Sequence, residues 1–120
     1  MIRKHTISFK HAFDGLIFAF STQPNYRIHL FFSLLSIAGG IVLRIRYEEF
    51  LTIGILITMG FVTETVNTAI EETCDAVDED IRPDIKVAKD TAAAAMLIFA
   101  IGSSVLAGCI FIPRIIHIFL

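Results

Sequence analysis

The sequence lacks the motifs by which soluble nucleotide-binding and nucleic-acid-binding proteins are usually recognised. It contains neither GxxxxGK[ST] nor a GxGxxG that follows a predicted strand. It has no Ser/His/Asp arrangement and no His/Cys cluster, and the absence of a basic patch excludes binding to nucleic acid. Its two cysteines, Cys74 and Cys109, are expected at different depths, so no disulfide is expected.

Charged residues are also few, at 18%, whereas 55% of the 120 residues are hydrophobic and are gathered into long runs. Three runs approach or reach the ~20 residues that a helix needs to cross a bilayer. The sequence therefore predicts one domain, 1–120, of the all-α integral membrane class. The transmembrane helices are expected at about 28–45, 49–71 and 91–112.

A fourth helix is expected before the spans, over residues 5–22. Its apolar side chains fall mostly on one face, which is typical of a helix that lies in the membrane interface. Pro24 is expected to break the chain before the first span. Small side chains are frequent in the third span, where they favour close helix packing in lipid, so we expect a homo-oligomer.

The positive charges are distributed unevenly about the spans. Seven lysines and arginines precede the first span or lie between the second and third, against three at the other ends. The positive-inside rule then places the N-terminus in the cytoplasm of a multi-pass protein.

An acidic stripe follows the apolar half of the second span. The residues Glu64, Asn67, Glu71, Asp75 and Asp78 fall within roughly 80° of a helical wheel. A carboxylate in hydrocarbon is costly without a partner, so a metal or proton site is the functional interpretation. Alternatively the helix leaves the membrane at about Val62, which would put Glu71 and Asp75 in water. Glu64 has apolar neighbours at helical spacing, and partial burial makes a carboxylate a better base.

Two further groups of polar residues flank the spans. Lys86 and Lys89 are one turn apart and are suited to an anion such as a nucleotide phosphate, although lysines at a cytoplasmic flank can serve topology alone. In the segment from Gln23 to His29, Gln23 and Asn25 can cap the helix, and Arg27 and His29 can simply anchor it at the membrane surface.

Together these motifs resemble those of the small prokaryotic diacylglycerol kinase family, which includes undecaprenol kinases. Glu64-x-x-Asn67-Thr-Ala-Ile-Glu71-x-x-x-Asp75 is similar to the family's ExxNTAIExxxD, and the segment Lys86-Val-Ala-Lys89-Asp90-x-Ala-Ala-Ala to its KxAKDxAAxAV. Weaker likenesses are Ser8-Phe9-x-x-Ala12-x-x-Gly15 and Asn25-x-Arg27-x-His29. The resemblance covers nearly the whole chain.

The resemblance implies a homotrimer in the bacterial inner membrane that moves the γ-phosphoryl group of ATP to a lipid hydroxyl. The lipid would be undecaprenol or diacylglycerol, and the product would feed phospholipid synthesis or lipid-carrier recycling. Glu64 would be the catalytic base, with Asn67, Lys89 and Asp90 beside it in the site. Glu71 would bind Mg²⁺. The residues implied in ATP binding are Lys4, His11, Asp75, Lys86, Lys89 and Asp90.

One position departs from the family pattern. Gln23 stands where the family has a metal-binding glutamate, and an amide is a poorer Mg²⁺ ligand than a carboxylate. This leaves open a weakly active or inactive member of the family. A proton-coupled transporter that uses Glu64 is a second alternative, but it does not explain Lys86, Lys89 or Asp75. The Asn25-x-Arg27-x-His29 segment and the core from Asn67 to Glu71 look more like the undecaprenol kinase branch than the diacylglycerol branch.

Overall fold

A computed structural model describes residues 2–80 and 82–120, with side chains given for residue 6, residues 8–80 and residues 82–120. This part of the chain is built of helices alone. They are α1 (Ile2–Thr22), α2 (Pro24–Val42), α3 (Tyr47–Val77) and α4 (Pro83–Phe119). The all-helical class expected from the sequence is confirmed, and α2, α3 and α4 are each long and apolar enough to cross a membrane.

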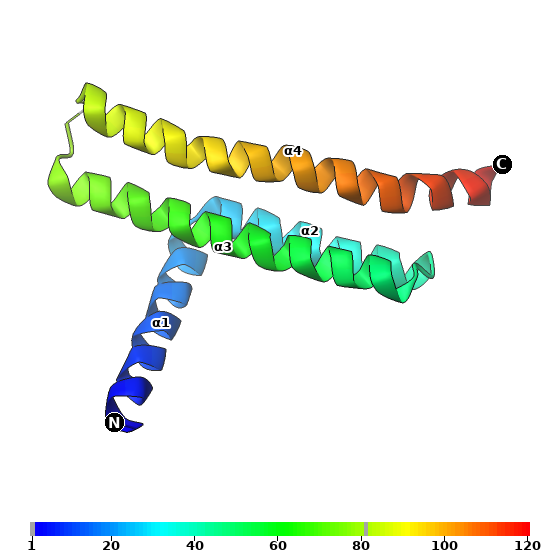
Figure 1. The fold of residues 1–120 in the computed structure, drawn as a ribbon, viewed down its shortest axis with the longest axis horizontal. Helices are drawn as coiled ribbons and strands as arrows, with labels where there is room; N and C mark the ends of the chain where they lie inside the picture. The colour runs from blue at the N-terminus through cyan, green and yellow to red at the C-terminus, as the bar shows by residue number, and fades with distance from the viewer. Residues whose placement is uncertain (1, 81) are drawn as a thin grey trace.

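The three long helices run side by side, whereas α1 leaves them at a steep angle (Figure 1). The end of α3 and the start of α4 extend together beyond the start of α2 (Figure 1). At 1.5 Å per residue, the 31 residues of α3 span about 46 Å, which exceeds the ~30 Å of bilayer hydrocarbon. The acidic end of α3 therefore has room to project beyond the apolar layer.

The junction between α1 and α2 is a single residue. Gln23 has an extended backbone at the N-cap of α2, and Pro24 occupies the first helical turn, where its missing N–H is tolerated. The break expected at Pro24 is therefore present. Across the junction, Arg27 donates a hydrogen bond of 2.9 Å to the carbonyl of Ser21, which ties the start of α2 to the end of α1.

The turn from α2 to α3 depends on a close approach at Gly40. A Cβ at this position would lie 2.8 Å from the Phe50 ring and 2.9 Å from Ile45 Cδ1, so a larger residue would have to displace both side chains. Arg44 takes a left-handed backbone with φ of 50°, and the N–H of Ile45 bonds back to the Gly40 carbonyl at 3.0 Å. Ile45 then packs into a small apolar core with Ile53 and Ile110.

An ion pair joins the same end of α3 to the end of α4. Arg114 contacts Glu49 with both arms of its guanidinium, and one arm also donates to the Ile110 carbonyl at 2.8 Å. The sequence placed the end of the third span before Pro113, but α4 continues through this proline to Phe119. Because side chains and neighbouring helices can satisfy backbone groups freed by a proline, such a residue is tolerated within a membrane helix.

Most apolar side chains of the three long helices point outward. Only 17%, 17% and 6% of the residues in the most apolar windows of α2, α3 and α4 are buried. Surfaces of this kind face lipid or further protein, as in an integral membrane protein. The expected homotrimer and the interfacial placement of α1 stay predictions.

Candidate active site

One stripe along α3 changes from apolar to polar halfway along the helix. Its residues are three or four positions apart, so they lie on one face of the helix. In chain order they are Ile53, Ile57, Gly60, Glu64, Asn67, Glu71 and Asp75. Glu64 is the first carboxylate of the stripe, and it marks the boundary between the two halves.

Glu64 is completely buried, with 0% of its surface exposed. The Asn25 side chain of α2 lies within reach of a hydrogen bond to the Glu64 carboxylate, and the Glu71 carboxylate lies close enough to repel it. Within the described residues, however, neither of its carboxylate oxygens has a partner at hydrogen-bonding geometry. A buried carboxylate that meets no more than one weakly aligned amide is unfavourable, so this group is retained at a cost to stability.

Asn67 lies one turn further along the stripe and is also buried, with 6% exposed. Its side-chain oxygen Oδ1 has no hydrogen-bond partner among the described atoms. These three buried oxygens, none with a partner at full hydrogen-bonding geometry, therefore belong to two residues that lie one turn apart on α3. Such oxygens indicate a site for a donor or a cation that the protein itself does not supply.

Glu71 and Asp75 form the outer part of the stripe. Asp75 makes an ion pair with Lys89 of α4, and Lys89 is partly buried, with 37% of its side chain exposed. Glu71 is half-buried and acts electrostatically on both Glu64 and Lys89. The structure thus places the predicted metal carboxylate between the predicted base and the predicted phosphate-binding lysine.

Lys86 and Asp90 form an ion pair with each other along α4. Both side chains are well exposed, at 61% and 63%. By helical spacing they lie on a face of α4 next to that of Lys89. The structure therefore brings Lys89 to the stripe of α3 and leaves Lys86 and Asp90 beside it at the surface.

The remaining predicted site residues lie on α1 and at its junction with α2. Gln23 is half-buried, and its side chain makes no capping hydrogen bond, so the capping interpretation from the sequence is wrong for this residue. His11 is exposed on α1. The side chain of Lys4 lies outside the described residues.

A metal would need help from another molecule to bind here. The described residues hold no group of three or more His, Cys, Asp or Glu side chains that could bind a metal by themselves. Mg²⁺ commonly takes one or two carboxylates and completes its shell with substrate phosphates and water. Glu71 and the free oxygens of Glu64 and Asn67 are hard donors of this kind. The residues therefore fit a cation shared with a phosphate and do not fit one held by the protein alone.

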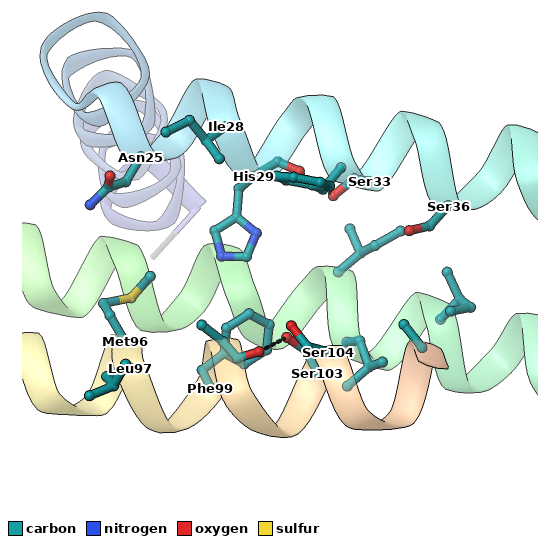
Figure 2. A pocket seen from close by; sticks show the side chains of 16 residues that line it. Asn25, Ile28, His29, Ser33, Ser36, Met96, Leu97, Phe99, Ser103 and Ser104 are labelled. Atoms are coloured by element: carbon teal, nitrogen blue, oxygen red, sulfur yellow. Dashed lines mark hydrogen bonds between the residues drawn. The ribbon is translucent and has the colours of Figure 1, made fainter. Parts of the chain in front are cut away.

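The apolar half of the α3 stripe forms one wall of a groove of about 560 Å³. The other walls are stripes of α2 and α4, and Figure 2 shows their side chains converging between the helices. The polar residues in the lining are Asn25, His29, Ser33, Ser36, Ser103 and Ser104. Asn25 lines this groove and its side chain also reaches Glu64, so Asn25 links the groove to the buried carboxylate.

Sequence reasoning missed this groove, and it also missed Tyr26, a buried residue that joins α2 to α3 next to Glu64. Tyr26 is 2% exposed, and its hydroxyl lies 2.7 Å from Thr65 Oγ1, next to Glu64. Because Thr65 already donates to the Phe61 carbonyl at 2.7 Å, Tyr26 is the donor in this pair. The only signal in the sequence was the position of Tyr26 between Asn25 and Arg27 at the start of a span.

Comparisons with known proteins identify relatives of the chain. Residues 10–111 match the family model for prokaryotic diacylglycerol kinase. A diacylglycerol kinase of Synechocystis sp. is 31% identical over 113 residues, which is 93% of this chain. An undecaprenol kinase of Bacillus subtilis is 33% identical over 108 residues, or 90% of this chain and 88% of that protein. The chain spans 65% of the length of the Synechocystis protein.

Three long apolar helices are typical of a membrane protein, and the two relatives are enzymes by name, a diacylglycerol kinase and an undecaprenol kinase. The chain belongs to the prokaryotic diacylglycerol kinase family. The family expected from the sequence motifs is thereby confirmed, and so is its enzyme class, a kinase that phosphorylates an alcohol. The comparisons do not favour the transporter alternative.

Proposed function

We propose that this chain transfers the γ-phosphoryl group of ATP to the hydroxyl of a membrane lipid, undecaprenol or diacylglycerol. The observation that carries the proposal is the position of Glu64. This buried carboxylate lies on the same face of α3 as Ile57 of the groove, two turns further along, where the apolar half of the stripe gives way to polar side chains. A kinase that acts on a lipid needs such a boundary, because its acceptor comes from the bilayer and its donor from water.

The polar half of the stripe suits the donor. Lys89 supplies a cation for the phosphates, and it is held by Asp75 until a phosphate competes for it. Glu71 and Asn67 would hold Mg²⁺ together with the phosphate oxygens, and this ion would offset the negative charge of the transferred group. Gln23 would offer at most an amide oxygen. His11, Lys86 and Asp90, with Lys4, would complete the nucleotide site around them.

The apolar half of the stripe suits the acceptor. With the lipid chain in the groove, its hydroxyl would lie beside Glu64, and the carboxylate would accept the hydroxyl proton. The lipid oxygen forms a bond to the γ-phosphorus as the bond from that phosphorus to the bridging oxygen breaks, and ADP leaves. Positioning and charge stabilisation supply most of the catalysis in such transfers, and a base near the hydroxyl assists.

We also propose how the protein is arranged in the membrane. Its outward-facing apolar surfaces suit a homotrimer in the bacterial inner membrane, with the N-terminus in the cytoplasm. The steep angle between α1 and the bundle suits a helix lying along the cytoplasmic interface (Figure 1). Gln23 makes a weakly active enzyme the second candidate, since it reduces the negative charge available to Mg²⁺.

The test is phosphate transfer from radiolabelled ATP to diacylglycerol and to undecaprenol, with saturating Mg²⁺ in detergent. We expect labelled lipid with the unaltered protein and at least a ~100-fold loss with Glu64→Gln, since a positioned base contributes about 10²- to 10⁴-fold. Glu48→Gln is the matched control, because Glu48 is exposed at the opposite end of α3. No labelled lipid from the unaltered protein would refute the proposal for these acceptors. Full activity of Glu64→Gln would remove Glu64 from the role of base.

A further inference from the structure

His29 is a polar side chain in the groove for which the reaction above has no use. It lines the groove on α2, one turn after Asn25. Its backbone carbonyl accepts a hydrogen bond of 2.7 Å from Ser33, but its ring makes no hydrogen bond or ion pair within the described part of the chain. A polar ring without a partner in apolar surroundings is unfavourable, so an occupant that offers an oxygen would stabilise it.

The imidazole ring is held in place by three neighbours. Phe61 and Phe99 lie against it, with ring centroids 5.6 Å and 5.2 Å away. It rests directly on α3 at Gly60, where an added Cβ would lie only 2.3 Å from its Cε1 atom. Figure 2 shows the ring projecting from α2 into the space between the helices. The ring is therefore a fixed feature of the groove.

The position of the ring relative to Glu64 follows from the helix register. On α2, the Asn25 side chain reaches Glu64 of α3. One turn further along α2, the His29 ring rests on Gly60, which lies one turn before Glu64 on α3. One turn corresponds to about 5.4 Å along a helix. An oxygen atom that forms hydrogen bonds of ~2.8 Å with two groups can bridge about 5.6 Å between them. By this register, one hydroxyl oxygen has the reach to bridge the Glu64 carboxylate and the His29 ring.

We propose that His29 donates a hydrogen bond to the hydroxyl oxygen of the acceptor lipid and so holds this oxygen against Glu64. The proposal rests on the proposed function for the identity of the occupant. A hydroxyl oxygen has one proton and two lone pairs. The proton is donated to Glu64, one lone pair accepts from His29, and the other faces the phosphorus. Diacylglycerol and a polyprenol share this terminal hydroxyl, so the site recognises either by the same contact.

The test compares lipids with and without the hydroxyl in binding to the full-length protein in detergent. One pair is dioctanoylglycerol and dioctanoyl-1,2-propanediol, and the other is farnesol and its hydrocarbon lacking the hydroxyl. His29→Phe keeps an aromatic ring between Phe61 and Phe99 but removes the donor, and His29→Gln restores an N–H. We expect His29→Phe to weaken binding of the hydroxyl lipids by about 3- to 10-fold, the range of one neutral hydrogen bond. Binding of the analogues should not change, and His29→Gln should recover part of the loss.

Kinetics provide a second readout. In the same variant the KM for lipid should rise by a similar factor, while the KM for ATP stays within about 2-fold. His29→Leu replaces His29→Phe in both assays if the latter does not fold. If the substitution weakens binding of the hydroxyl lipid in one pair and not in the other, the affected pair identifies the acceptor that the site takes.

The outcomes separate this inference from the proposed function. Equal losses for hydroxyl and deoxy lipids, or no loss for either, would overturn the role of His29 even if phosphate transfer is normal. A loss confined to the hydroxyl lipids would support it even if the unaltered protein transfers no phosphate, in which case only the kinase proposal fails.

Discussion

Lys89 on α4 and Asp75 on α3 form an ion pair that joins the two helices beside the acidic stripe. The pair means that the cation we assign to the phosphates is neutralised by the protein when no nucleotide is bound. A phosphate must therefore compete with Asp75 for Lys89. Because the pair is partly exposed, its strength is modest and a multiply charged phosphate can displace it.

Replacement of Lys89 by Met should raise the KM for ATP by about 10- to 100-fold, because a hydrogen bond to a charged group is worth ~1.5–3 kcal/mol. The KM for lipid should change little, since the groove lies on the other side of Glu64. Steady-state kinetics with each substrate varied in turn measures both constants. Lys10→Met is the matched control, as Lys10 is exposed on α1. A rise in the lipid KM alone would place Lys89 on the acceptor side.

Replacement of Gln23 by Glu should lower the Mg²⁺ concentration that gives half-maximal activity. The substitution restores a carboxylate at the position where the family pattern has one, and Mg²⁺ prefers carboxylates to amides. The measurement is a Mg²⁺ titration at fixed ATP and lipid. Thr22→Glu, one residue away on the exposed end of α1, controls for a general effect of added charge. Identical titration curves for the unaltered protein and Gln23→Glu would show that this side chain is remote from the metal.

Replacement of Gly60 by Ala should destabilise the protein by about 1–3 kcal/mol, the usual range for overpacking. The new methyl group would lie 2.3 Å from the His29 ring, which must move away from α3. Thermal unfolding in detergent measures the loss. The control is Gly54→Ala, because no atom lies within 4 Å of a Cβ at that position, and alanine favours a helix over glycine. If the two variants unfold alike, the ring does not rest on α3 as described.

The features that the sequence predicted are those that depend on local spacing. The apolar runs gave the three long helices, because a bilayer sets the length of an apolar helix. The acidic stripe could be read because residues three or four apart on a helix share a face. The prediction that Glu64 is more buried than the carboxylates after it is confirmed, since Glu64 is fully buried and Asp75 is exposed.

The features that the sequence did not predict depend on contacts between helices. The groove requires the register of α2, α3 and α4 together, and nothing in one helix shows which serine of another it faces. The sequence also could not show which lysine pairs with which acid, because either Lys86 or Lys89 could form an ion pair with Asp75 or Asp90. The extent of α4 was underestimated for a related reason. The contacts of Arg114 with Ile110 and Glu49 lie just beyond Pro113, where a proline normally suggests that a helix ends.

The contact between Glu49 and Arg114 has a consequence at the opposite end of the molecule. From Glu49 to Glu64, α3 rises about 22 Å, so this ion pair is remote from the reaction. It nevertheless fixes how far α4 can slide along α3. A slip of one turn back along α3 would bring Lys89 opposite Glu71 in place of Asp75. The ion pair between Glu49 and Arg114 therefore helps to set Asp75 as the partner of Lys89. It thereby leaves Glu71 free to bind a cation.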